Sequence, residues 1–184
     1  AAAASKMPLH TTGGISGGFF IEGVPRPGAG EDQPRAHWVL VTPGYHRVLG
    51  TPLLAGRGFT PQDDGKALQV ALVDELLAER YLGGDAIGKR LRAIGGKWWT
   101  IVGVVESVKL GALSADDEPI LYFPAAQAGE MLTFNRLSTG VVVRTTHDPM
   151  SIVPAVRQFA WEPEPASPLF NVMPLTERLD QTFD

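Results

Sequence analysis

The sequence predicts an α+β fold of two lobes, one built from strand–helix units and one richer in strands. Two patterns lead to this prediction. An apolar run followed by a helical segment recurs three times, and between the second and third units the period changes to that of a β-hairpin. The 184 residues, 44% of them hydrophobic, are enough to bury a core for one domain or two small lobes. The 21 glycines and 15 prolines predict many turns, but they stay short of the share that is typical of low-complexity chains.

The N-terminal segment, residues 1–35, is expected to be partly flexible. Residues 1–18 are rich in Ala, Gly and Thr and hold little to pack. We therefore expect the first strand near 19–21, where a Phe-Phe-Ile run begins. Residues 25–34 have the Pro- and Gly-rich composition of a loop.

Each strand–helix unit has an apolar strand, a residue that can cap a helix, and a helical segment. The predicted strands are 38–41, 70–73 and 141–143. The helices that follow them are predicted from 42 to 50, from 75 to 82 and from 148 to about 161. After the third unit we expect a returning strand at 170–173 and an amphipathic helix at 175–184. Thr42, Asp74 and Asp148 are the expected N-terminal caps. Gly50 ends the first helix, and Pro154 either bends the third or marks its first turn.

The middle of the chain, about 51–125, is richer in strands. Residues 90–105 predict a β-hairpin, because Gly95 and Gly96 form a natural two-residue turn between two alternating segments. A further strand is predicted at 120–123, after a polar loop.

Composition narrows the functional classes. The net charge of −4 argues against a nucleic-acid partner, which would need a basic surface. The absence of cysteine excludes disulfides, thiol nucleophiles and thiolate metal sites. No apolar run reaches the roughly 18–20 residues of a membrane-spanning helix. The chain begins with Ala rather than Met and its last predicted helix lacks a terminating cap, so we expect a piece of a longer protein.

Residues 14–18, Gly-Ile-Ser-Gly-Gly, match the G-x-S-x-G string of a nucleophile elbow. An elbow needs a sharp turn from a strand into a helix, whereas Ser16 lies in a Gly-rich stretch that precedes a predicted strand. No later acid and His stand out as its partners. A flexible Gly/Ser segment is therefore the interpretation that we favour.

Other groups of polar residues also have simple structural explanations. No metal-ligand spacing separates the four histidines, which are His10, His37, His46 and His147. The acidic clusters are typical of solvated turns, and they are Asp63-Asp64 and Asp116-Asp117-Glu118. A basic and aromatic group fits the polar face of the hairpin better than a nucleic-acid platform, and it comprises Lys89, Arg90, Arg92, Lys97, Trp98 and Trp99. No phosphate-binding loop is present. We assign no catalytic, cofactor-binding or metal-binding residue, and expect no cofactor and no enzymatic activity.

An ordered series of short segments runs through about residues 36–180. It comprises Thr42-Pro43-Gly44-Tyr45, Pro52-Leu53-Leu54, Gly56-Arg57-Gly58-Phe59, Val70-Ala71-Leu72-Val73-Asp74-Glu75, Ala78-Glu79-Arg80-Tyr81, Ile87-Gly88-Lys89-Arg90-Leu91, Thr100-Ile101-Val102-Gly103-Val104-Val105, Tyr122-Phe123-Pro124-Ala125, Val141-Val142-Val143-Arg144-Thr145 and Asp148-Pro149. In this order the segments resemble the extracytoplasmic core domain of MacB-like, FtsX-related ABC transporter permeases, particularly the orphan permeases of acidobacteria. Two departures lie at element edges: Asp74 replaces the usual Asn, and residues 82–86 lack the usual prolines.

The resemblance implies a non-catalytic domain between the first two transmembrane helices of a permease, on the outer face of the bacterial inner membrane. It implies a porter-like lobe at 36–50 and 126–184, joined by 70–85, and a β-rich lobe inserted mainly at 51–125. The domain would couple ATP-driven helix movement to efflux or to force transmission outside the membrane.

The implied partners are the flanking transmembrane helices, a cytoplasmic ABC ATPase, a second permease copy that gives a dimer, and a periplasmic adaptor, with no nucleic acid. Two alternatives stay open. One is a stand-alone periplasmic binding or adaptor module. The other is a serine hydrolase that uses Ser16 or a loop acid.

Overall fold

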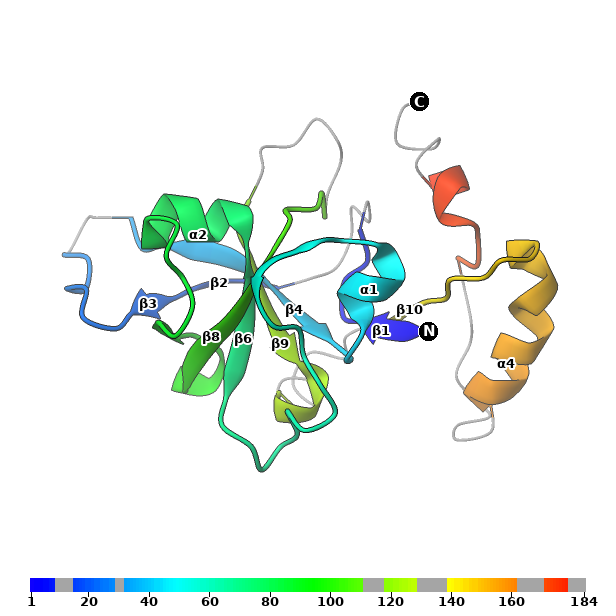
Figure 1. The fold of residues 1–184 in the computed structure, drawn as a ribbon, viewed down its shortest axis with the longest axis horizontal. Helices are drawn as coiled ribbons and strands as arrows, with labels where there is room; N and C mark the ends of the chain where they lie inside the picture. The colour runs from blue at the N-terminus through cyan, green and yellow to red at the C-terminus, as the bar shows by residue number, and fades with distance from the viewer. Residues whose placement is uncertain (9–14, 29–31, 111–117, 129–138, 162–170, 179–184) are drawn as a thin grey trace. The chain divides into compact units, whose positions relative to one another are not determined.

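A mixed sheet of ten strands organises the first 142 residues (Figure 1). The computed structural model describes residues 1–8, 15–28, 32–110, 118–128, 139–161 and 171–178. Its strands are β1 (Ala2–Ala4), β2 (Ile15–Gly18), β3 (Phe20–Ile21), β4 (Arg35–Val41), β5 (Leu53–Gly56), β6 (Val70–Asp74), β7 (Arg90–Arg92), β8 (Trp98–Val105), β9 (Ile120–Pro124) and β10 (Gly140–Val142). Their order is β10-β1-β4-β9-β6-β8-β7-β3, with β2 also paired to β4 and β5 also paired to β8.

The centre of the sheet consists of β4, β9, β6 and β8. The pairs β4–β9 and β6–β8 are parallel, whereas β6 and β9 run antiparallel. Every residue of β6 and β9 is buried. Strands of this kind read as continuous apolar runs because both of their faces are covered. The predicted α+β class is confirmed.

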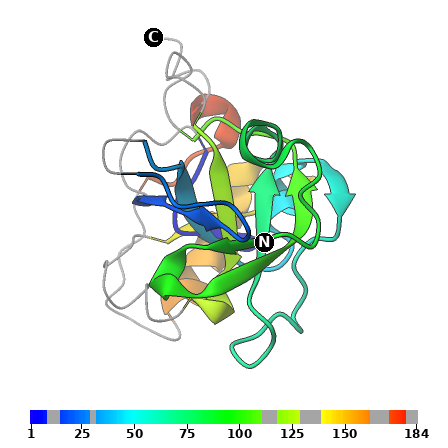
Figure 2. The ribbon, with the colours of Figure 1, turned by 90° about the vertical axis from the view of Figure 1, so that its left-hand side faces the viewer.

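Alternating side chains of the central strands build one apolar core on each face of the sheet. The helix α2 (Glu75–Leu82) covers one face, where Leu77 packs in a cluster with Trp99 and Phe123. The short helix α1 (Tyr45–Leu49) contributes Tyr45 to the cluster on the other face, which includes Tyr122. Figure 1 places the two helices at separate parts of the sheet, and Figure 2 views α2 end-on.

The predicted cap of α2 is confirmed, and the predicted hairpin forms with a longer turn than expected. The side chain of Asp74 caps α2 by accepting a hydrogen bond from the backbone N–H of Leu77 at 2.9 Å. In the hairpin of β7 and β8, Gly95 and Gly96 have φ angles of 62° and 67°. Glycine reaches positive φ without a steric penalty. The turn is longer than the predicted two residues, because Arg92 pairs with Trp98 and Ile94–Gly96 form a 3₁₀ turn between the strands.

The N-terminal residues differ from the prediction. Residues 1–18 were expected to hold little to pack, but they contain β1 and β2 ahead of the predicted first strand. Both strands pair with β4, and Ala2 and Ala4 are buried. Strand pairing uses backbone groups, so small side chains suffice once an edge is available. β1 also explains the wrong cap of α1: Thr42 Oγ1 accepts a hydrogen bond from the N–H of Ala3 at 2.8 Å, and the helix instead begins after Gly44.

Residues Val143–Asp184 form a second compact unit. In it a 3₁₀ turn, Pro149–Ile152, leads into α4 (Val153–Trp161), and the Asp148 side chain accepts a hydrogen bond from the N–H of Met150 at 3.2 Å. Pro154 therefore marks the first turn of α4 rather than a bend. The predicted strand at 170–173 is wrong over residues 171–173, which have no regular structure. Residues 175–178 are helical, and the rest of the predicted C-terminal helix lies outside the described residues.

Candidate functional site

Ser16 lies directly opposite His37 where β2 pairs with β4. The two strands are antiparallel, and the register matches these two residues. Directly paired residues project to the same side of a sheet, so their side chains can meet. The Ser16 Oγ atom lies 2.8 Å from Nδ1 of His37.

The second ring nitrogen of His37 contacts Glu118, which lies two residues before the start of β9. The distance between Nε2 of His37 and Oε2 of Glu118 is 2.6 Å. The backbone N–H of His37 also donates to the carbonyl of Pro119 at 2.8 Å, which fixes the local alignment of β4 with this segment. Three residues from three separate segments thus form one hydrogen-bonded chain.

The network defines the proton positions of a neutral His37. An ionised carboxylate can only accept hydrogen bonds, so Nε2 carries the proton that is donated to Glu118. Nδ1 is then the acceptor, and the hydroxyl of Ser16 donates to it. This tautomer is assigned from its hydrogen-bond partners.

Charged neighbours and burial favour the neutral imidazole. Burial lowers the pKa of His37, the positive charge of Lys6 lowers it further, and Glu118 acts in the opposite direction. Lys6 is itself buried, and this burial lowers its own pKa. On the other side of the site, Arg35 donates from Nη2 to the carbonyl oxygen of Ser16 at 3.5 Å. A neutral base therefore sits between an exposed hydroxyl and a carboxylate.

The sequence reasoning missed this network. No acid and His stand out in the sequence as partners of Ser16, but in the structure His37 contacts both Ser16 and Glu118. The local sequence carries no signal for the arrangement, since the three residues meet only through the pairing of β4 with β2 and β9. Ser16 itself lies within a paired strand rather than on a turn into a helix.

The other described histidines, His46 and His147, have different contacts. His46, on α1, packs edge-on against Tyr45 and Tyr122, with ring centroids 5.2 and 4.6 Å apart. His147 is exposed beside Thr146, and His10 lies outside the described residues. Within the described ranges, no group of three or more His, Cys, Asp or Glu side chains could hold a metal ion.

A second polar cluster is buried beneath α1. Burial raises the pKa of the Asp74 carboxyl to about 6 and lowers the pKa of His46 to about 4. The hydroxyls of Tyr45 and Tyr122 and both ring nitrogens of His46 have no hydrogen-bond partner among the described residues. Burial of polar groups without hydrogen-bond partners costs free energy, so we expect substitutions in this cluster to change the stability of the fold.

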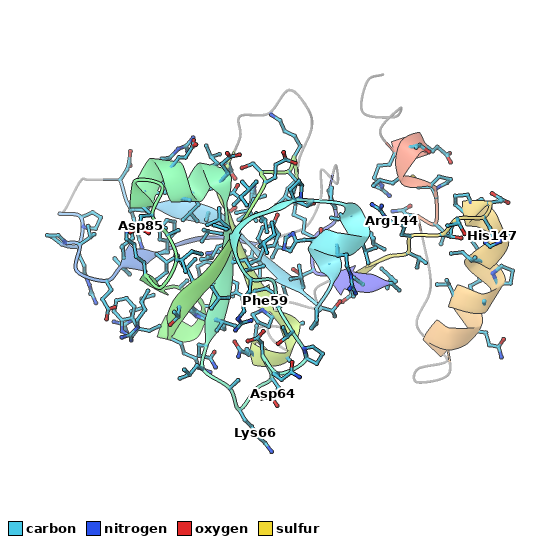
Figure 3. All side chains as sticks on the ribbon, in the orientation of Figure 1. Phe59, Asp64, Lys66, Asp85, Arg144 and His147 are labelled. Atoms are coloured by element: carbon cyan, nitrogen blue, oxygen red, sulfur yellow. The ribbon has the colours of Figure 1, made fainter. Side chains whose placement is uncertain are left out.

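The acidic clusters differ from the expected solvated turns at two positions. Asp63 is buried and binds the guanidinium of Arg57 with both carboxylate oxygens, at 2.8 and 2.9 Å. Asp64 is exposed and accepts from the backbone N–H of Lys66, on a loop that extends away from the sheet (Figure 3). Glu118 belongs to the His37 network. The other members of its cluster, residues 116 and 117, lie outside the described residues.

The basic and aromatic residues belong to the hairpin and its surroundings. The guanidinium of Arg90 lies 5.3 Å from the ring centre of Trp98 and pairs with Glu22 at 3.0 Å. Trp99 is fully buried, so its ring is not available to stack on a base. Lys89 donates from Nζ to the carbonyl of Leu82 at 2.9 Å.

Comparisons with known proteins describe the same fold. A family model described as the MacB-like periplasmic core domain matches residues 16–159. The structure is similar to the periplasmic region of MacB from Actinobacillus actinomycetemcomitans, with 18% sequence identity and a TM-score of 0.60. The similarity covers 98% of this chain and 74% of that MacB chain. It is also similar to the extracellular domain of the noncanonic ABC-type transporter YknZ from Gram-positive bacteria, with 15% identity, coverage of 94% and 80%, and a TM-score of 0.54.

A sequence comparison with curated proteins gives no match. In the part of the chain that the structure describes, no helix has the length and apolar character needed to span a bilayer.

Proposed function

Because this chain belongs to the family of MacB-like periplasmic core domains of ABC transporter permeases, we propose that it couples ATP-driven movement of transmembrane helices to events outside the membrane. The movement would serve efflux or the transmission of force to a partner. The observation that carries this proposal is the family match over residues 16–159, which includes the whole centre of the sheet.

The packing of the first unit supports a mechanical role. A domain that transmits movement must move as a body, and a sheet that is covered on both faces resists deformation because protein interiors are close-packed. The central strands are buried, and the two parallel pairs extend along five residues of β9 and β6. A displacement applied at one end of β4 and β9 is passed along their hydrogen-bonded ladder, whose register is unbroken over five residue pairs.

The proposed partners follow from the family rather than from a contact in the structure. They are the transmembrane helices of the same permease, a cytoplasmic ABC ATPase, a second permease copy and a periplasmic adaptor. We further propose that the domain has no catalytic role in transport, and that its lobes divide as 36–50 with 70–85 and 126–184, and 51–125.

The absence of cysteine allows a direct test of location. We would place single cysteines in the parent permease at Leu68, which is 85% exposed, or at Ala71, which is fully buried. In intact cells with a permeabilised outer membrane, a membrane-impermeant maleimide is expected to label Leu68→Cys without lysis. Ala71→Cys should react only after denaturation. Labelling of Leu68→Cys only after the inner membrane is opened would contradict an extracytoplasmic location.

Coupling needs a second measurement on the same variant. A spin label at Leu68→Cys, in the permease with its ATPase, should report different distances between the two copies in the ATP-bound and nucleotide-free states. An unchanged distance distribution, in a sample whose ATPase is active, would contradict the mechanical proposal. If the domain copurifies with neither permease segments nor an ATPase, it is a stand-alone binding or adaptor module.

A further inference from the structure

We propose that Ser16 is a base-activated nucleophile that accepts an acyl group from an activated ester at the surface of the domain. This activity is separate from the transport role. The inference rests on the hydrogen-bonded chain of Ser16, His37 and Glu118, with distances of 2.8 and 2.6 Å. Ser16 is exposed, so an ester can reach its hydroxyl.

A serine hydroxyl is a weak nucleophile unless an adjacent base removes its proton. His37 is in position to do so, because its unprotonated Nδ1 accepts the hydrogen bond from Oγ. The lowered pKa of His37, caused by burial and by Lys6, keeps the imidazole in this basic form at neutral pH. The carboxylate of Glu118 would then stabilise the imidazolium that forms as the proton is transferred.

The proposed step balances without a cofactor. Oγ of Ser16 attacks the ester carbonyl carbon, and its proton passes to Nδ1 of His37. As the tetrahedral intermediate collapses, the new bond between Oγ and the carbonyl carbon remains, and the bond to the leaving alkoxide breaks. His37 returns the proton to the alkoxide, which leaves as the alcohol. The products are acylated Ser16 and the alcohol, and His37 and Glu118 return to their starting states.

A positively charged side chain, Arg35, contacts the backbone of Ser16. Its guanidinium donates to the backbone carbonyl of Ser16, so it lies on the site's edge. A cation near the developing oxyanion lowers the barrier of acyl transfer. The order of the imidazole nitrogens differs from the usual triad, in which the serine contacts Nε2. The requirement for activation is the chain of contacts from hydroxyl to base to acid, and both nitrogens of the ring can take part in it.

The chain provides matched controls in the second unit. The hydroxyl of Thr146 lies 3.4 Å from Nδ1 of His147, and among the described residues no carboxylate pairs with that histidine. Ser151 is an exposed serine whose hydroxyl donates to the carbonyl of Asp148. Both hydroxyls lack the activated arrangement and report the background reaction.

The test uses the complete 184-residue chain and p-nitrophenyl acetate, with the acetylation of each hydroxyl followed by peptide mass spectrometry. Ser16 should react about 100-fold faster than Thr146 or Ser151, which is the size of a general-base contribution, and His37→Phe should lower its rate to that of these two hydroxyls. Glu118→Gln should slow the reaction less, because the amide can still accept from Nε2. The rate in the unaltered chain should rise with pH to a plateau, and the midpoint of this rise should lie below 6.5, the ordinary pKa of histidine, because the pKa of His37 is lowered.

Acetylation of Ser16 at the rate of Ser151 would overturn the proposal. So would an undiminished rate in His37→Phe, provided that circular dichroism shows this variant to be folded. His37→Gln replaces it if His37→Phe does not fold, because the amide remains polar but is no base. Either result leaves the transport proposal untouched, since the location and distance measurements do not involve Ser16.

Discussion

The carboxylate of Asp74 and the hydroxyl of Ser107 form a 3.2 Å hydrogen bond that connects the start of α2 to the segment after β8. Ser107 Oγ also accepts from the backbone N–H of Leu76 at 3.2 Å. Asp74 is thus the cap of the helix and a link between two segments. Its position in the core makes this charge expensive, since burial disfavours the ionised form.

Asp74→Asn is expected to raise the free energy of unfolding at pH 7 by about 2 kcal/mol, because it removes a buried charge while its amide oxygen still caps α2. The pKa of Asp74 is raised to about 6, so between pH 4 and 6 the folded chain holds a proton that the unfolded chain has lost. Asp74 therefore lowers the free energy of unfolding as pH rises through this window. Urea denaturation from pH 4 to 7 should show the advantage of Asp74→Asn growing with pH. A constant difference would contradict the raised pKa.

His46 has the opposite dependence on pH. Its pKa is lowered to about 4, so between pH 4 and 6.5 the unfolded chain binds a proton that the folded chain does not. His46 thus makes the fold less stable as pH falls through this window. His46→Phe keeps an aromatic ring against Tyr45 and Tyr122 and removes two buried ring nitrogens that have no partner among the described residues.

We expect His46→Phe to exceed the unaltered chain in free energy of unfolding by an amount that increases as pH falls from 6.5 to 4. The same urea series measures this difference. His46→Phe and Asp74→Asn should therefore change the pH dependence of the free energy of unfolding in opposite directions. Parallel slopes for the two variants would contradict the opposite pKa shifts of Asp74 and His46.

The local elements and the functional network differ in how far the sequence predicts them. The helix at 75–82 and the strand at 70–73 could be predicted because their signals are local: an apolar run, a cap and a terminating glycine. β1 and β2 could not, because their small side chains have no apolar period. They are strands through pairing with β4 and, for β1, with β10. The contacts of Ser16 and Glu118 with His37 depend on the register of three strands that are distant in sequence, which no local pattern encodes.

Asp63→Ala should lower the free energy of unfolding by about 1–2 kcal/mol, because it breaks a two-pronged contact with Arg57 and two hydrogen bonds from Thr60. The loss is small for a buried carboxylate because the Arg57 side chain is 48% exposed and solvent screens the pair. Asp64→Ala, one residue further on, removes only exposed turn contacts and should cost about 0.5 kcal/mol. Equal losses in thermal denaturation would show that burial of Asp63 does not matter.

The same pair predicts an acid limit for the fold. Hydrogen bonding to Arg57 holds the pKa of Asp63 below its usual value. The contribution of Asp63 is therefore present above the ordinary pKa of about 3.8 and lost as pH falls through the lower folded value. Asp63→Ala and the unaltered chain should approach each other in free energy of unfolding below pH 3, and a gap that stays constant down to pH 2 would be inconsistent with an ionised Asp63.

Gly103→Ala tests a close backbone approach in the sheet. Gly103 pairs with Leu72 of β6 on one side and with Gly56 of β5 on the other. A Cβ atom at this position would overlap the carbonyl oxygen of Arg57 and lie 2.7 Å from Cδ2 of Leu72. The backbone oxygen cannot move without displacing β5, so we expect a loss of about 2–3 kcal/mol in the free energy of unfolding.

Gly58→Ala is the matched control, because nothing lies within 4 Å of its added Cβ and its backbone needs no positive φ. That variant should be neutral or slightly more stable, since alanine restricts the unfolded chain. Urea denaturation of both variants at pH 7 measures the difference, and a Gly103→Ala chain as stable as Gly58→Ala would mean that β5 does not pack against β8 as closely as the structure has it.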